Sequence, residues 1–336
     1  MRLVAGQGYF GDSSDKSIGP WCEYTIVPQG FQARGGYASS SPRGDCGWVA
    51  RILRSMGRLH IGDNLPCMAA MPAGSVRLVY ADPPFGTNSA RIATGGEYAD
   101  SWADPEAYVA WLRPRVVEMR RLLAPDGTLY LHLDRRSVHH ARMLLDLVFG
   151  PHNFQNEIIW HYTGGGRGLR WFPHKHDNIL VYHKGPGYIF NADALREPYA
   201  PTSGYARGGI RARSGKRYAP HPEGKLMDDV WHIPIVNPLS RERTGYPTQK
   251  PEALLRRIVL ASTDAGDLVL DPFCGSGTTA AVAQALGREW VAIDSSTSAI
   301  EITRARLMVA ESALMEGETA NEPHQVGGDG SSPTRP

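Results

Sequence analysis

The chain has 336 residues, a net charge of +2 and a hydrophobic content of 42%. This length suits two domains or one large α/β domain with insertions, and no apolar run approaches the roughly 18 residues that a membrane span needs. The N-terminal residues lack the apolar core of a signal peptide, so we expect a cytoplasmic protein. The four cysteines are scattered and lack the spacing of a zinc site, so we expect neither a zinc site nor a disulfide framework.

The first part of the chain is rich in Gly, Ser, Pro and Arg and shows no sustained helical or strand periodicity. We interpret residues 1–57 as a loosely structured arm. Regular structure is predicted from residue 58 onward, beginning with a strand that ends in a Gly62-Asp63 turn. Asp63 is either a plain turn residue or a ligand contact at the sheet edge, and its position alone favours the turn.

The stretch Asp82-Pro83-Pro84-Phe85 follows an apolar run over residues 75–81 that predicts a buried strand. Two consecutive prolines exclude both a helix and a central strand, so the chain must turn at the carboxyl end of this strand. Ligands of open α/β sheets bind at this edge, where the tetrapeptide displays a carboxylate, a carbonyl and an aromatic ring. A turn without function is the alternative, because Asp-Pro pairs often begin turns.

Helices and strands alternate over the next part of the chain. Asp104 and Pro105 supply an N-cap and a first-turn proline for a long amphipathic helix, in which Pro114 is a candidate kink. A strand over 128–134, a helix over 138–149 and a strand over 157–160 are predicted to follow. This alternation indicates a parallel sheet with helices on both faces.

The composition changes over residues 161–247, where glycines cluster and aromatic residues alternate with basic ones. Between His161 and Lys250 there are 14 Lys plus Arg against 7 Asp plus Glu, hence +7, which leaves the rest of the chain at +2 − 7 = −5. This pattern is typical of a surface that tracks phosphates and stacks on bases, although a charged run can also be a solvated face. The densest cationic cluster comprises Arg211, Arg213, Lys216 and Arg217.

A helix start is predicted near Thr248, a good N-cap residue, with Pro251 in the first turn and a helix over 253–262. Free backbone N–H groups and the Lys250 ammonium would converge there, which makes an anion site suited to a carboxylate.

A second glycine-rich turn follows a short strand over 268–270 and precedes a helix over 280–286 and a strand that ends at Asp294. Strand, glycine turn, helix and a strand ending in an acid form the nucleotide-binding half of a doubly wound fold. Only Gly275 and Gly277 are present, without the third glycine of dinucleotide dehydrogenases, so a nicotinamide oxidoreductase fits poorly. The tail over residues 311–336 is predicted to be disordered.

Three motifs resemble those of one family. Asp271-Pro-Phe-Cys-Gly-Ser-Gly-Thr-Thr resembles the S-adenosylmethionine motif of the DNA amino-methyltransferases, and Asp82-Pro-Pro-Phe resembles their catalytic tetrapeptide. Tyr246-Pro-Thr-Gln-Lys-Pro is similar to the segment that closes the cofactor pocket, and the order of the motifs is that of the β class. The resemblance implies a circularly permuted Rossmann-like methyltransferase sheet. Its parts would be a catalytic half over 58–160, a target-recognition region over 161–247 and a cofactor-binding half over 248–310.

The resemblance also implies the cofactor, S-adenosylmethionine, and the residues that bind it. The methionine and ribose portions would lie against the glycine-rich turn, through Asp271, Phe273, Gly275, Gly277 and Thr278. Asp294 would bind the ribose hydroxyls, and Thr248 and Lys250 at the helix start would bind the methionine carboxylate. Asp63 would lie near the adenine end.

The tetrapeptide suits the chemistry of an exocyclic amine, whose lone pair is delocalised into the base and is therefore a poor nucleophile. Asp82 and the Pro83 carbonyl would accept its protons, and Phe85 would stack on a base flipped out of double-stranded DNA. In the family, Asp at the first position accompanies adenine and Ser accompanies cytosine N4. We therefore expect methylation of adenine N6, with a cytosine N4 enzyme and a catalytically idle DNA-binding protein as alternatives. A cognate restriction endonuclease and a homodimer are partners that the sequence does not decide.

Overall fold

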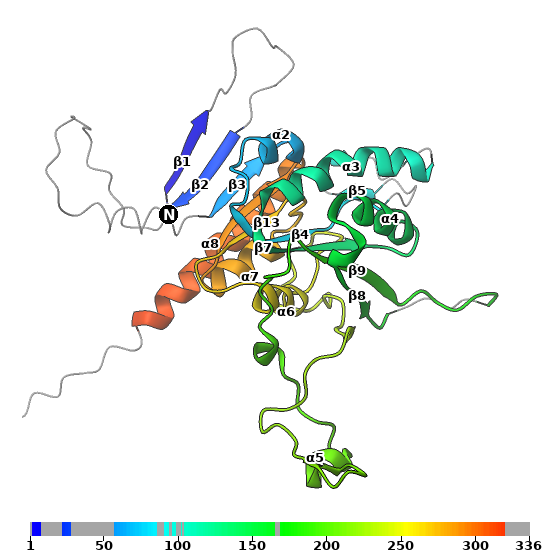
Figure 1. Cartoon of the computed structure of the whole chain (residues 1–336). Coiled ribbons are helices and arrows are strands. Elements are labelled where there is room, and N and C mark those ends of the chain that lie inside the picture. The colour runs from blue at the N-terminus through cyan, green and yellow to red at the C-terminus, as the bar shows by residue number, and fades with distance from the viewer. Residues whose placement is uncertain are drawn as a thin grey trace, which may run out of the picture.

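The computed structural model describes residues 2–7, 22–27, 57–85, 91–93, 96–98, 102, 104–164 and 169–319. Its centre is a ten-stranded sheet with helices on both faces (Figure 1). In spatial order the strands are β1 (Arg2–Gln7), β2 (Cys22–Val27), β3 (Arg58–Ile61), β14 (Glu289–Asp294), β13 (Leu268–Asp271), β4 (Val76–Ala81), β7 (Leu123–Leu133), β9 (His176–His183), β8 (Phe154–His161) and β12 (Val230–His232).

The strands from β3 to β7 in this order are parallel, and they come from distant parts of the chain. β3, an early strand, pairs with β14, the last strand, and β4 pairs with β13 through Leu78↔Val269 and Val79↔Leu270. From β13 the chain continues to β14 on one side, and from β4 it continues to β7 on the other. This reversal is a topological switch point, where open α/β sheets bind their ligands. The predicted circularly permuted, doubly wound fold is confirmed.

Alternating side chains of the strands pack into two apolar layers. On one face the core contains Leu78 and Tyr80 of β4 and is covered by α6 (Glu252–Ser262), α7 (Thr278–Ala285) and α8 (Thr297–Thr319). On the other face the core contains Val76, Val79 and Ala81 and is covered by α2 (Asn64–Ala69), α3 (Pro105–Leu122) and α4 (Val138–Phe149). Because β4 is buried on both faces, its end is held rigidly, and so is the turn that follows it.

Several expectations from the sequence were wrong. The arm over 1–57 contains the strands β1 and β2, which pair antiparallel with each other and extend the sheet at β3. The sheet is not wholly parallel, because β9 runs antiparallel to both β7 and β8. β9 and β12 also place part of the 161–247 region in the sheet. The apolar run 179–182 in β9 was the signal for this, but the surrounding glycines and basic residues obscured it.

The long helix predicted to start at Asp104 and Pro105 is confirmed as α3, which has Asp104 as N-cap and continues through Pro114 to Leu122. Two other helix boundaries differ from the prediction. The helix α6 begins at Glu252 with Pro251 as N-cap, so Thr248 is not a capping residue. The helix α8 continues to Thr319, which places residues 311–319 in a helix and not in a disordered tail. Residues 320–336 lie outside the described part of the chain.

Part of the 161–247 region forms a lobe that extends away from the sheet and carries α5 (Gly204–Gly208) (Figure 1). The lobe also contains the hairpin β10 (Ile210–Arg211) and β11 (Arg217–Tyr218). The short helix η2 (Ala192–Leu195) stays close to the body, because Asn191 at its start bonds to the end of α6. Three further short elements are the hairpin β5 (Arg91–Ala93) and β6 (Gly96–Tyr98) and the helix η1 (Pro151–Asn153). Among the helices of the described residues, none has the length and apolarity that crossing a bilayer requires.

Candidate active site

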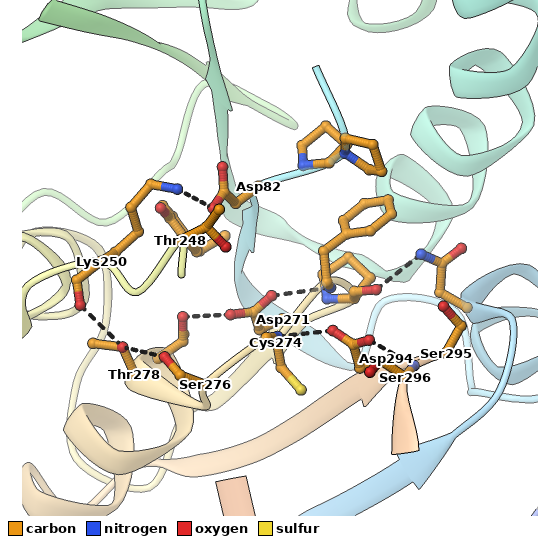
Figure 2. Close-up of a pocket in the computed structure, with 18 of the residues that line it drawn as sticks. Asp82, Thr248, Lys250, Asp271, Cys274, Ser276, Thr278, Asp294, Ser295 and Ser296 are labelled. Carbon is orange, nitrogen blue, oxygen red and sulfur yellow. Dashed lines mark hydrogen bonds and ion pairs between the residues drawn. The ribbon is translucent and has the colours of Figure 1, made fainter. Parts of the chain in front are cut away.

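A cavity of about 290 Å³ opens at the carboxyl ends of β4 and β13, at the switch point of the sheet. The Asp82–Phe85 turn, the 271–279 turn and the segment around Tyr246 to Lys250 line it together (Figure 2). The turns that begin at Asp82 and Asp271, 271 − 82 = 189 positions apart in the sequence, thus meet because β4 and β13 are neighbours.

The catalytic turn begins directly after β4, and its carboxylate is largely buried. Asp82 Oδ2 forms an ion pair with Lys250 Nζ, and the two side chains are 16% and 12% exposed. Asp82 Oδ1 is buried and has no hydrogen-bond partner among the residues that the structure describes. The Lys250 ammonium also lies 5.6 Å from the centre of the Phe85 ring, within cation–π range. One cation thus contacts both the carboxylate and the aromatic face that the sequence predicted would hold a substrate.

The turn after β13 depends on two glycines in left-handed conformations. Gly275 has φ +50°, and a Cβ atom there would approach Tyr246 Cε1 at 3.1 Å, on the cavity side. Gly277 has φ +71°, and a Cβ atom there would meet Thr303 Cγ2 of α8 at 2.5 Å. Gly275 is therefore needed for close approach at the cavity, whereas Gly277 is needed for packing against α8.

Buried carboxylates hold this turn in place. Asp271 accepts hydrogen bonds from Phe273 N at 3.1 Å and from Thr279 Oγ1 at 2.5 Å, and burial raises its pKa to about 7. Asp294, at the end of β14, accepts from Gly275 N at 2.8 Å and from Ser296 N at 2.9 Å. Burial also raises the pKa of Asp294. Each carboxylate lines the cavity while it fixes backbone N–H groups of a turn.

A third wall of the cavity comes from the start of α2 and from α3. Asp63 caps α2 by accepting from Leu65 N at 2.8 Å, and Arg115 Nη2 donates to its carboxylate at 3.0 Å. Asn64 accepts from Arg115 Nε and donates to the Pro272 carbonyl, both within 2.9 Å. The Arg115 guanidinium also stacks over Trp111, 4.1 Å from its ring centre. This wall thereby joins α3 to the turn after β13.

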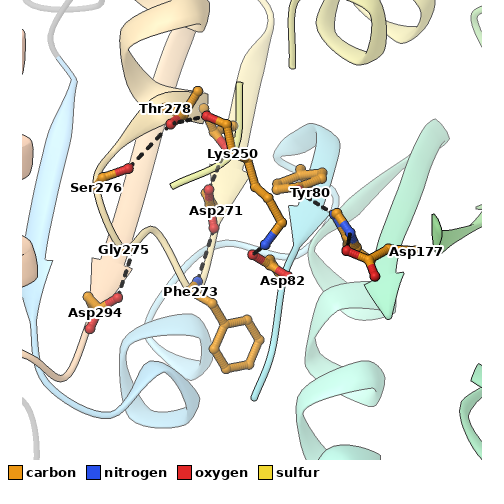
Figure 3. A network of polar contacts seen from close by, with 12 residues as sticks. Tyr80, Asp82, Asp177, Lys250, Asp271, Phe273, Gly275, Ser276, Thr278 and Asp294 are labelled. Carbon is orange, nitrogen blue, oxygen red and sulfur yellow. Dashed lines mark hydrogen bonds and ion pairs between the residues drawn. The ribbon is translucent and has the colours of Figure 1, made fainter. Parts of the chain in front are cut away.

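A polar chain lies behind the catalytic turn (Figure 3). Tyr80 OH is 2.8 Å from His132 Nδ1, and His132 Nε2 is 3.4 Å from Asp177 Oδ2. Burial opposes ionisation of Asp177, but hydrogen bonds from His132 and Tyr162 outweigh it and lower the pKa of its carboxyl group. Asp177 is therefore the acceptor in its contact with His132 Nε2, and the Tyr80 hydroxyl bonds to the other ring nitrogen, Nδ1. Tyr80 lines the cavity, so this chain connects the cavity to β9.

The predicted catalytic and cofactor-binding residues meet here with one exception. Lining the cavity are Asp63, Asp82, Pro83, Pro84, Phe85, Thr248, Lys250, Asp271, Phe273, Gly275, Thr278 and Asp294. Gly277 does not line it. Tyr246, the first residue of the segment that was expected to close the cofactor pocket, also lines it. The sequence analysis missed Tyr80, Trp111 and Arg115, which line the cavity too but look like ordinary strand and helix residues in the sequence.

The fold and the cavity define a class of protein: a doubly wound α/β enzyme with a nucleotide-type glycine turn beside an acidic, aromatic turn. Comparisons with known proteins agree. A sequence model of the DNA methylase family, N6/N4 type, matches residues 76–305. The DNA adenine methyltransferase YhdJ of Escherichia coli K12 is 34% identical over 251 residues, which cover 74% of this chain and 82% of that protein.

A second relative in sequence and a solved structure with the same fold were also found. The type II methyltransferase M.HpaI of Haemophilus parainfluenzae is 31% identical over 253 residues, or 74% of each chain. The PvuII cytosine-N4-specific DNA methyltransferase shares the fold with a TM-score of 0.56 and 15% identity, over 78% of this chain and 93% of that one. The chain belongs to the N6/N4 DNA methylase family. It is a DNA methyltransferase, and the cofactor expected for this family, S-adenosylmethionine, is its methyl donor.

Proposed function

We propose that the protein methylates the N6 amine of an adenine flipped out of double-stranded DNA. The observation that carries this proposal is that Asp82 Oδ1 is buried and, within the described part of the chain, finds no hydrogen-bond partner. A buried carboxylate oxygen without a hydrogen bond is costly, and an N–H donor of a bound substrate would remove that cost. The named activity of YhdJ as an adenine methyltransferase favours adenine over cytosine.

In this proposal the tetrapeptide holds and activates the amine. Asp82 and the Pro83 carbonyl accept its two N–H bonds, which directs the nitrogen lone pair away from the ring. Asp82 then takes the proton that the nitrogen loses as its bond to carbon forms. The Phe85 ring stacks on the base, and Pro84 fixes the turn that presents both groups. The bound cofactor supplies the methyl group.

The cofactor is proposed to occupy the part of the cavity between the 271–279 turn and α2. Asp271, Phe273, Gly275 and Thr278 would contact its methionine and ribose portions, and Asp294 its ribose hydroxyls. Close backbone approach at Gly275 and the carboxylate of Asp294 at the end of β14 fit a ribose. Asp63 would lie near the adenine, on the same wall as Trp111.

Lys250 has a second role in this proposal. Its ammonium contacts Asp82 and lies near the Phe85 ring, which is where the amine of the base would bind. A substrate base must therefore displace the Lys250 ammonium from Asp82. Among the cavity-lining residues that the structure describes, Arg115 is already bonded to Asp63, Asn64 and Trp111, which leaves Lys250 to meet the cofactor carboxylate. Cofactor binding would then free Asp82 for the base.

The residues 161–247 are proposed to recognise the target sequence, with Arg211, Arg213, Lys216 and Arg217 contacting DNA phosphates. These side chains are exposed on the β10–β11 hairpin of the lobe. Since its substrate is genomic DNA, we also propose that the protein works in the cytoplasm of its host. A cognate endonuclease and a homodimer stay open proposals, and light scattering would test the second.

The function is tested by expression in cells that lack DNA methylation, followed by sequencing of the genomic DNA for modified bases. We expect N6-methyladenine within a fixed short sequence, and none in cells that express Asp82→Ala at an equal level. Modified cytosine in place of adenine would favour the N4 alternative. Unmodified DNA from folded, cofactor-binding protein would favour the idle DNA-binding alternative.

A further inference from the structure

An apolar segment projects from the sheet beside the active site. Leu169, Trp171 and Phe172 are 98%, 65% and 93% exposed. Exposed apolar side chains are normal when they are scattered singly over a surface. Here three exposed apolar side chains lie within four consecutive residues, together with the basic residue Arg170. We call residues 169–172 the tip.

The tip lies at the same edge of the sheet as the catalytic turn. It belongs to the connection between β8 and β9, which leaves the sheet at His161 and returns at His176 (Figure 1). In the register of the sheet, Leu131 of β7 is level with Ala81 of β4, and Leu133 of β7 is level with Asn178 of β9. At about 4.8 Å between neighbouring strands, β9 is only about 10 Å from β4.

A direct chain of contacts joins the two places. Asp177, the residue after the connection returns, bonds to His132, and His132 bonds to Tyr80 in the cavity wall. The His132 ring also lies 6.0 Å from the Phe85 ring. The return of the connection at Asp177 is therefore linked through His132 to the catalytic turn, and the tip projects from the edge of the sheet at which a flipped base would enter the cavity.

We propose that Trp171 and Phe172 enter the DNA stack beside the flipped base and hold the gap that it leaves. This inference rests on the proposed function, because it requires a flipped target base. Apolar side chains that enter a base step separate the neighbouring bases, and exposed aromatic rings stack on them. Arg170 and the neighbouring Lys175 supply positive charge beside the rings, as a polyanionic partner requires. A second copy of this chain would not need that charge.

The test uses a duplex with the methylated sequence found in genomic DNA, in which 2-aminopurine replaces the target adenine. Its fluorescence rises when the base leaves the stack. In the wild type with cofactor present, we expect this rise on binding. In Trp171→Ala/Phe172→Ala we expect the rise to be lost and affinity to fall by roughly 5- to 150-fold for each stacked ring that is removed. Phe190→Ala is the control, because Phe190 is also exposed, at 55%, but follows the opposite end of β9.

A second duplex, with a mismatched base opposite the target, distinguishes a wedge from general damage. A mismatched base is easier to flip, so a variant that lacks only the wedge should recover most of its fluorescence rise and its kcat/KM. Equal losses on both duplexes, or wild-type behaviour on both, would overturn the proposal. Sedimentation of a wild-type dimer and a monomeric variant would assign the tip to self-association. If the wild type methylates no adenine, the proposed function fails, and the wedge fails with it.

Discussion

The ion pair between Lys250 and Asp82 leads to a sharp prediction about stability. Lys250→Met keeps the length of the side chain but leaves the Asp82 carboxylate without a partner, since its Oδ1 already lacks one. Removing one member of a buried ion pair costs about 3–5 kcal/mol, because an uncompensated charge stays buried. Both side chains retain some exposure, 12% and 16%, so we expect the lower end of this range, about 3 kcal/mol.

This loss should depend on Asp82. In an Asp82→Asn background no charge is left unpaired, so Lys250→Met should then cost less than about 0.5 kcal/mol, as expected for an uncoupled substitution. In the wild-type background, Tm should fall by roughly 6 °C, at about 2 °C per kcal/mol for a chain of this size. Urea unfolding of the four proteins without cofactor gives the complete double-mutant cycle. Equal losses in both backgrounds would show that the two side chains do not interact, and our reasoning about the ligand-free site would then be wrong.

Three further predictions follow from the site and the lobe. Gly275→Val places a branched side chain at φ +50° against Tyr246, so calorimetry should detect no S-adenosylmethionine binding while circular dichroism shows a folded protein; normal affinity would refute this placement of the cofactor. The pKa of Asp271, raised to about 7 by burial, means that the folded state keeps a proton that the unfolded state loses near pH 4, so stability should fall between about pH 4 and pH 7 and then level off. The free energy of unfolding of Asp271→Asn should therefore rise relative to that of the wild type across this window, by up to about 4 kcal/mol at 1.36 kcal/mol per pKa unit. A difference in unfolding free energy between the two proteins that is the same at every pH would contradict this. Replacing Arg211, Arg213, Lys216 and Arg217 with Ser should lower DNA affinity and flatten its salt dependence, by about 0.9 in the slope per lost phosphate contact, without changing cofactor affinity; unchanged fluorescence anisotropy titrations would show that this cluster is only a solvated face.

Motifs that couple a strand to its turn could be predicted from the sequence. Asp82 and Asp271 each follow or end a short apolar strand, and the carboxyl ends of parallel strands share one edge. Their meeting in one cavity therefore follows from local pattern and from the general rules of doubly wound sheets. Gly277 misled the prediction, because a glycine with positive φ looks the same in a sequence whether a ligand or Thr303 approaches it.

Contacts that depend on tertiary packing could not be predicted. Arg115 reaches Asp63 only because α3 lies beside α2, and Asp177 reaches His132 only because β9 is inserted next to β7. The ion pair between Lys250 and Asp82 could not be predicted either, because a sequence does not reveal which of several carboxylates a lysine contacts in the absence of ligand. The strands β1 and β2 could not be predicted from the sequence either, since edge strands depend on pairing with a neighbour and show little hydrophobic pattern of their own.

In the proposed reaction, Asp82 accepts the proton of an adenine N6 amine. The most direct test incubates the purified protein with DNA and S-adenosylmethionine labelled in its methyl group, digests the DNA and identifies the labelled nucleoside by mass spectrometry. We predict that the label appears in N6-methyl-2′-deoxyadenosine. For Asp82→Asn we predict a methylation rate roughly 10²–10⁴-fold lower, with unchanged cofactor affinity. Label in N4-methylcytosine, or an undiminished rate for the variant, would contradict the account.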